Sequence, residues 1–166
     1  MQKVIIIGSP GAGKSTFARK LRDKTGLPLY YLDKIWHKPD KTTVSKEEFD
    51  ARLSAILATE CWIIDGNYGR TLEMRMQACD TVFLFDLPAY VCLEGLRERL
   101  GQEHEDLPWT ETELDAEFMQ WVADFPNKQL LKIYRLFEQY KSERNMFIFH
   151  TREEADAFIL NLSKYE

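Results

Sequence analysis

Two hydrophobic periodicities alternate along the chain. Short β-rich apolar runs predict strands over residues 3–7, 29–32, 61–65, 81–86 and 146–150. Between and after them, apolar residues recur at helical spacing, which predicts helices over residues 14–24, 45–59, 71–77, 90–100, 111–124, 127–141 and 152–164. Strands that alternate with helices are typical of a parallel sheet covered on both faces by right-handed crossover connections. The pattern therefore predicts an α/β fold.

Length and composition narrow the class of protein. A chain of 166 residues with 45% hydrophobic and 30% charged residues is expected to form one globular domain. No apolar run approaches the roughly 20 residues that cross a bilayer, and the N-terminal apolar stretch is too short for a signal peptide, so we expect a cytoplasmic protein. The net charge of -5 argues against a broad nucleic-acid interface but leaves room for a local basic patch. The cysteines Cys61, Cys79 and Cys92 show no spacing typical of a disulfide or zinc site, and we expect small buried apolar side chains.

One motif follows the first predicted strand, at the edge where parallel sheets bind ligands. Residues 8–15 read GSPGAGKS, which matches GxxxxGK[ST] without a gap. Glycine lets the backbone N–H groups of such a loop point into one concavity, and the next helix offers its positive N-terminus to the same phosphate. We expect Lys14 to reach the β- and γ-phosphates and Ser15 to bind Mg²⁺. The residues predicted to hold the donor nucleotide are Gly8, Pro10, Gly11, Ala12, Gly13, Lys14, Ser15 and Thr16.

A second candidate site follows residues 61–65. This predicted strand ends in Asp65, and GNYGRT comes next, with Arg70 five residues beyond the acid. A carboxylate there can hold Mg²⁺ directly or through water, and an arginine can bind a second phosphate with two hydrogen bonds. Asp65 could instead cap the next turn, and Arg70 could be a solvated surface charge.

Three segments together resemble the nucleoside monophosphate kinases, adenylate kinase above all. They are the glycine loop, IIDGNYGRT and DTVFLFDLPAYVCLEGLRERLG, and the likeness covers nearly the whole chain. More narrowly, YLDKIWHKP and WIIDGNY are similar to the small adenylate kinase-related family of DNA topology modulation proteins. The resemblance implies a P-loop NTPase fold, a three-layer α/β/α sandwich with a parallel five-stranded sheet in one domain of residues 1–166. It also implies an acceptor-binding arm at about residues 34–60 and a lid-like helical insertion at about residues 101–126.

This resemblance assigns roles residue by residue. The glycine loop would bind ATP, Asp65 would lie beside Mg²⁺, and Gly66 and Arg70 would face the acceptor. Arg99 matches the family arginine that precedes the lid. Asp86 closes the fourth predicted strand, either near the metal or in a purely structural role.

The presumed acceptor side contains four further candidates. Asp33 ends the second predicted strand, where related small-molecule kinases place an acceptor-binding acid, although it could also cap a turn. Trp36 could stack on a base or pack beneath its own arm. His37 and Tyr68 could each donate to a phosphate or remain solvated.

The expected lid departs from the family pattern. Between Arg99 and Lys128 the sequence has eight acidic residues and no lysine or arginine, and Gly95 stands where adenylate kinase would carry an arginine. An acidic lid should repel a triphosphate, whereas phosphoryl transfer needs cations around the transferring group. Some of these acids could form the solvated face of a helix. The missing cations could then come from Lys128, Lys132, Arg135 and Arg144, of which Arg135 is the preferred candidate.

Two functions fit these features. The first is a phosphotransferase that moves the γ-phosphoryl group of MgATP to a nucleoside monophosphate or a similar small acceptor, with Lys14, Arg70, Arg99 and Arg135 in catalytic roles. For an alcohol acceptor, Asp33 is the natural base. The alternative is a nucleotide-binding regulatory module of the topology modulation type with little turnover, which the acidic lid favours. Direct nucleic-acid binding is less favoured, no membrane partner is expected, and the protein could be a monomer or homodimer.

Overall fold

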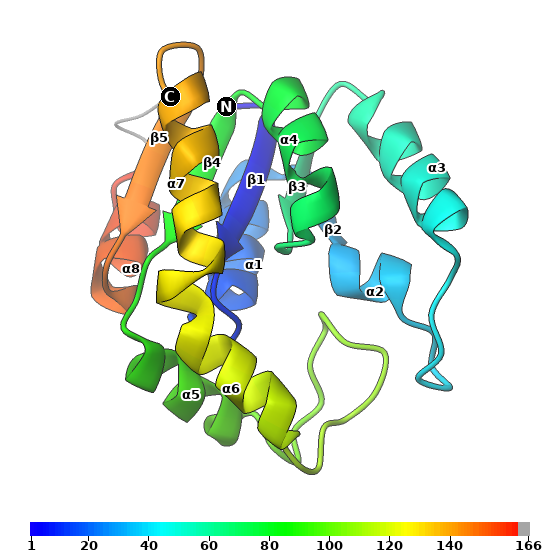
Figure 1. The fold of residues 1–166 in the computed structure, drawn as a ribbon. Helices are drawn as coiled ribbons and strands as arrows, with labels where there is room; N and C mark the ends of the chain where they lie inside the picture. Colours follow the sequence, from blue (N-terminus) through cyan, green and yellow to red (C-terminus); the bar gives the residue numbers. More distant parts are fainter. Residues whose placement is uncertain (163–166) are drawn as a thin grey trace.

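The computed structural model describes residues 1–162, and the fold has three layers (Figure 1). The strands are β1 (Lys3–Gly8), β2 (Leu29–Tyr31), β3 (Trp62–Asp65), β4 (Thr81–Phe85) and β5 (Asn145–Phe149). They form one five-stranded sheet in the order β2-β3-β1-β4-β5, and every neighbouring pair is parallel. The predicted α/β fold with a five-stranded parallel sheet is therefore confirmed.

Helices cover both faces of this sheet. They are α1 (Lys14–Thr25), α2 (Leu32–Trp36), α3 (Lys46–Leu57), α4 (Gly69–Ala78), α5 (Ala89–Glu98), α6 (Ala116–Asp124), α7 (Gln129–Tyr140) and α8 (Arg152–Leu160), with a 3-10 turn, η1, at Phe125–Asn127. Helices α1 and α8 pack on one face, and α4 and α7 pack on the other. None of the helices of residues 1–162 has the length and apolar character to span a lipid bilayer.

The central strand explains why both faces are covered. In β1 the side chains of Val4 and Ile6 enter one apolar cluster, while Ile5 and Ile7 enter the other, and all four are fully buried. Such a continuous apolar run is typical of a strand buried on both faces, and burial of each large side chain contributes about 1.5–3 kcal/mol. The apolar core thereby fixes where the polar residues after each strand emerge.

The structure corrects the sequence prediction in three places. The helix predicted over residues 111–124 begins only at Ala116, because the Asp115 side chain accepts a hydrogen bond from the Phe118 N–H and caps the helix there. Residues 100–115, here called the acidic loop, contain no helix or strand. Helix α2 was not predicted. The helix predicted over residues 152–164 ends at Leu160, and its last two positions lie outside the described residues.

The cysteines match their expected role in part. Cys79 and Cys92 are buried and free, whereas Cys61 is free but only partly buried.

Candidate functional site

A cavity of about 1290 Å³ opens at the carboxyl ends of the strands. The glycine loop, the β3–α4 loop, the acidic loop and residues of α5, α6, α7 and α8 line it. Single small-molecule sites usually measure about 300–1,000 Å³. The cavity is therefore large enough for two substrates side by side.

The glycine loop has the geometry of a phosphate cradle. Gly8, Gly11 and Gly13 all have positive φ angles, and a Cβ at Gly11 would lie 2.0 Å from the carbonyl oxygen of Cys92. The Lys14 ammonium is buried and donates a 2.9 Å hydrogen bond to the Ser9 carbonyl oxygen. Burial lowers the pKa of Lys14, while the nearby Asp65 carboxylate opposes that shift. The loop thus presents backbone amides and one desolvated cation, which suits a phosphate.

Ser15 and Asp65 form a pair at the first turn of α1. The Ser15 hydroxyl donates a 2.6 Å hydrogen bond to Asp65 Oδ2. Asp65 Oδ1 is buried and has no hydrogen-bond partner within the described part of the chain. Burial raises the pKa of Asp65 to about 6. An unpaired carboxylate oxygen beside a serine hydroxyl fits a magnesium ion, which prefers oxygen ligands and takes the rest of its shell from water and phosphate.

Asp33 and Tyr68 meet on the acceptor side of the cavity. The Tyr68 hydroxyl donates a 2.7 Å hydrogen bond to Asp33 Oδ1, and both residues line the cavity. Tyr68 precedes α4 with a φ of 34°, an unusual value for a residue with a side chain. Burial is the main reason that the pKa of Tyr68 is raised, so the phenol remains a hydrogen-bond donor. The hydrogen bond thus fixes the Asp33 carboxylate at the wall of the cavity.

The two arginines expected to bind phosphate both line the cavity, and both are paired with carboxylates. Arg70 donates two hydrogen bonds to Asp50 on α3, at 2.7 and 2.9 Å. Arg99 donates a 2.8 Å hydrogen bond to Asp106 Oδ2 in the acidic loop. Each arginine is therefore brought to the cavity but is not free.

Comparison with known proteins agrees with this geometry. No established protein family's profile matches the chain. An adenylate kinase of Thermotoga neapolitana is 28% identical over 130 residues, which cover 60% of this chain and 59% of that relative. The chain is thus matched to less than two thirds of the curated relative's length.

Two solved structures share the fold over almost their whole length. A shikimate kinase from Bacteroides thetaiotaomicron has a TM-score of 0.58 at 17% identity, covering 98% of this chain and 96% of that one. A gluconokinase from Sinorhizobium meliloti 1021 has a TM-score of 0.56 at 13% identity, covering 99% and 94%. The chain therefore has the P-loop NTPase fold that these two kinases share.

Other residues predicted from sequence lie differently in this P-loop fold. Trp36 packs edge-on against Phe49, with ring centroids 5.7 Å apart, and does not line the cavity. His37 does line it and lies against the ring of Trp109 from the acidic loop, at 5.0 Å. Trp36 therefore packs within the predicted arm, which was the alternative to stacking on a base. Trp109 is an aromatic side chain of the cavity that was not singled out from the sequence.

Helix α7 brings Lys132 to the cavity and not Arg135, the preferred candidate from the sequence. Arg135 is exposed and is not among the described residues that line the cavity, whereas Lys132 is. Lys128 pairs with Asp124 at 2.7 Å, and Arg144 donates to the backbone carbonyl oxygens of residues 76 and 77. On this placement, Lys132 replaces Arg135 as the α7 candidate.

Asp86 is placed outside the cavity. Its carboxylate accepts a 2.5 Å hydrogen bond from the Tyr134 hydroxyl of α7 and lies 3.7 Å from His150 Nδ1. Asp86 thus connects the end of β4 to α7, which is the purely structural role that the sequence left open.

Two residues that position the loops of the site were not singled out from the sequence. The Asn67 side chain accepts from the Gly8 N–H at 2.9 Å and donates to the Gly8 carbonyl oxygen, so it fixes the start of the glycine loop. Arg75 is fully buried and donates to the carbonyl oxygens of Gly66, Asn67 and Tyr68. An arginine among the apolar positions of α4 was the available signal for this role.

Arg152, at the start of α8, is a third missed residue. Its Nη2 donates a 3.0 Å hydrogen bond to the Gly11 carbonyl oxygen, and its side chain lies beside Gly13. A Cβ at Gly95 would lie 2.3 Å from Gly11 O and 2.5 Å from Arg152 Nη2. Because Gly95 has no side chain, the Arg152 guanidinium of α8 has room to contact the glycine loop.

Proposed function

We propose that the protein is an ATP-dependent phosphotransferase that transfers the γ-phosphoryl group to a small acceptor. The observation that carries this proposal is the Ser15–Asp65 pair beside the buried Lys14, at the mouth of a cavity large enough for two substrates. The matched adenylate kinase and the shared fold of two small-molecule kinases support it.

Lys14 and the backbone amides of the glycine loop would bind the donor phosphates and stabilise the charge that develops during transfer. Ser15 and Asp65 would hold Mg²⁺ directly or through water. A magnesium ion bound there neutralises phosphate charge and orients the donor. Arg152 supports the cradle through the Gly11 carbonyl oxygen.

Two classes of acceptor fit the opposite side. An acceptor hydroxyl beside Asp33 would attack the γ-phosphorus, the bond from phosphorus to the bridging oxygen of ADP would break, and Asp33 would accept the hydroxyl proton. An acceptor phosphate needs no base, because its oxygen is already anionic, and Arg70 would bind it after leaving Asp50. The oriented Asp33–Tyr68 pair favours the hydroxyl acceptor, while the match to adenylate kinase favours the monophosphate.

A nucleotide-binding regulatory module of the topology modulation type is the second candidate. The observation in its favour is that Arg70 and Arg99 are both neutralised by carboxylates. Such a module would bind MgATP and change shape with little turnover.

One assay separates these candidates. The protein is mixed with MgATP and either AMP or a panel of small polyols, and ADP formation is followed for the native chain and for Lys14→Ala. ADP formation that requires both an acceptor and Lys14 supports the phosphotransferase. MgATP binding that Lys14→Ala abolishes, with no ADP from any acceptor, favours the regulatory module.

A further inference from the structure

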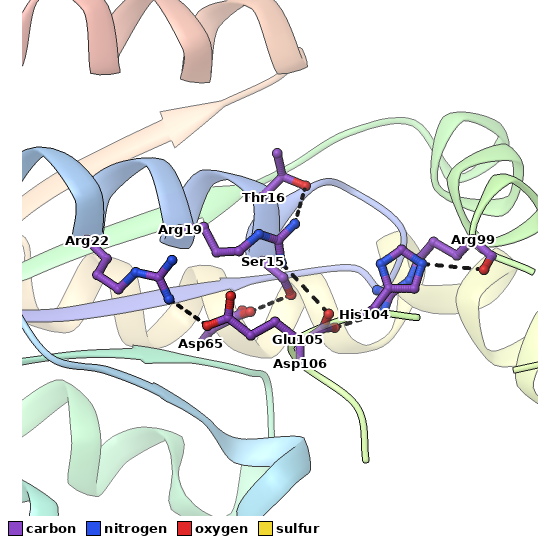
Figure 2. A network of polar contacts seen from close by, with 9 residues as sticks. All are labelled: Ser15, Thr16, Arg19, Arg22, Asp65, Arg99, His104, Glu105 and Asp106. Atoms are coloured by element: carbon purple, nitrogen blue, oxygen red, sulfur yellow. Dashed lines mark hydrogen bonds and ion pairs between the residues drawn. The ribbon is translucent and has the colours of Figure 1, made fainter. Parts of the chain in front are cut away.

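The acidic loop buries one carboxylate, while its other acids are exposed or partly exposed. Of the eight acids between Arg99 and Lys128, all within the described residues, only Asp106 is buried. Its Oδ2 accepts from Arg99 Nη2 at 2.8 Å, and its Oδ1 lies 4.0 Å from Arg19 Nη1 (Figure 2). Asp106 thus lies between two cations at the edge of the glycine loop.

The neighbouring residues hold Asp106 in this position. Glu105 pairs with Arg22 of α1 at 2.5 Å, and His104 Nε2 lies 3.4 Å from the Arg99 carbonyl oxygen (Figure 2). Although burial acts to raise it, the pKa of Asp106 lies below its ordinary value because of the Arg99 charge and the hydrogen bond that Arg99 donates. Asp106 is therefore an ionised carboxylate beside the residues that would receive the donor phosphates.

The two arginines are only partly satisfied by this carboxylate. Arg19 Nη1 and Arg99 Nε are buried, and neither has a hydrogen-bond acceptor among residues 1–162. The distance of 4.0 Å from Arg19 to Asp106 is too long for a hydrogen bond. A terminal phosphoryl group presents three acceptor oxygens where a carboxylate presents two, so it can satisfy donors that Asp106 leaves unpaired.

We propose that Arg19 and Arg99 form a phosphate-binding site for the polyphosphate of the donor, and that Asp106 occupies this site as an internal anion until the donor displaces it. The proposal rests on the proposed function, because it concerns the same donor site. It adds Arg19 as a binding residue and gives the acidic loop a definite task. Since Trp109 of the same loop touches His37 of the arm, displacement of Asp106 also loosens the contact between loop and arm.

The direct test measures binding of tripolyphosphate by calorimetry. We expect Asp106→Asn to bind it at least about fivefold more tightly than the native chain, because one buried competitor for two arginines is removed. Glu103→Gln is the matched control, since it removes an exposed carboxylate of the same loop that does not line the cavity. Its affinity should stay within about twofold of the native value.

A second pair of variants tests the arginines. In the Asp106→Asn background, Arg19→Gln and Arg99→Gln should each weaken tripolyphosphate binding about tenfold. Asp106→Asn that binds no more tightly than Glu103→Gln overturns the proposal, and so does a missing effect of Arg19→Gln. If either of these two contradicting results appears while Lys14→Ala still abolishes tripolyphosphate binding, only the roles of Asp106 and Arg19 fail. Binding that is insensitive to Lys14→Ala overturns the proposed function as well.

The native chain provides a measurement that does not depend on any variant folding. Hydrogen–deuterium exchange of residues 103–109 should accelerate when tripolyphosphate is added, because Asp106 leaves its buried position. Unchanged or slower exchange at saturating tripolyphosphate contradicts displacement.

Discussion

The hydroxyl of Tyr68 lies 2.7 Å from Asp33 Oδ1, so a phenol from the β3–α4 loop orients a carboxylate from the first turn of α2, the helix that follows β2. These residues are 35 positions apart in the chain and meet only because β2 and β3 are parallel neighbours. Their contact occupies one oxygen of Asp33 and fixes this carboxylate at the wall of the cavity.

Asp33→Asn distinguishes the two acceptor classes. We expect transfer to a hydroxyl acceptor to fall about 10²–10⁴-fold, because the base is lost, while transfer to AMP changes only a few-fold. Steady-state ADP formation with each acceptor measures the effect. Tyr68→Phe is the companion variant and should cause a smaller loss with the hydroxyl acceptor. Equal losses with both acceptors would contradict a role for Asp33 as a base.

Asp50→Asn should change how Arg70 binds an acceptor phosphate. Both partners of this ion pair are about half exposed, so breaking it should leave the thermal midpoint nearly unchanged. The freed arginine should lower KM for a monophosphate about two- to fivefold, and salt should reduce the effect. Glu48→Gln on the same helix removes the exposed pair with Arg52 and is the control. A rise in KM would show that Asp50 holds Arg70 in its productive position.

Asp65 makes stability depend on pH. Its pKa is raised by burial to about 6, from 3.8 in an unfolded chain. The folded state therefore binds a proton more readily, and the contribution of Asp65 to the free energy of unfolding falls as pH rises from about 4 to 6. Asp65→Asn should remove this loss and stabilise the ligand-free protein by roughly 3 kcal/mol at pH 7.

Urea unfolding at pH 4 and pH 7 checks this prediction. The difference between Asp65→Asn and the native chain should be present at pH 7 and nearly absent at pH 4. Although the variant is more stable, its rate of phosphoryl transfer should fall about 100-fold or more, because the carboxylate beside Ser15 is gone. A variant that is less stable than the native chain at pH 7 would contradict the burial cost assigned to Asp65.

Gly95→Ala tests the contact between α5, the glycine loop and Arg152. The added Cβ would lie 2.3 Å from the Gly11 carbonyl oxygen, so the loop or the helix must shift. We expect a loss of about 1–3 kcal/mol in the free energy of unfolding and weaker MgATP binding. Gly69→Ala is the matched control, since nothing lies within 4 Å of its added Cβ. Equal stability of both variants would contradict the close packing described at Gly95.

The sheet and the glycine loop could be predicted because their signals are local. The five strands are short apolar runs with clear boundaries, and GSPGAGKS specifies its own backbone. Asp65 and Arg70 were found because residues that follow strands gather at one edge of a parallel sheet. Helix α2 escaped prediction because five residues carry too little periodicity.

The remaining site residues depend on which surfaces face each other. Lys132 and Arg135 are three positions apart on α7, and the sequence does not show which of them turns toward the cavity. The burial of Asp106 is equally invisible, because the seven other acids of the segment have the same chemistry but are exposed or partly exposed. Arg152 reaches the glycine loop across 141 positions of sequence.

The buried guanidinium of Arg75 fixes the β3–α4 loop. Arg75 donates hydrogen bonds to three consecutive carbonyl groups of this loop, so the loop cannot shift without leaving a buried charge unpaired. Helices α2 and α3 pack against the same loop through the Tyr68–Asp33 hydrogen bond and the stacked rings of Phe49 and Tyr68. One buried side chain therefore sets the position of two separate parts of the site, through Asn67, which bonds Gly8, and through Tyr68, which bonds Asp33.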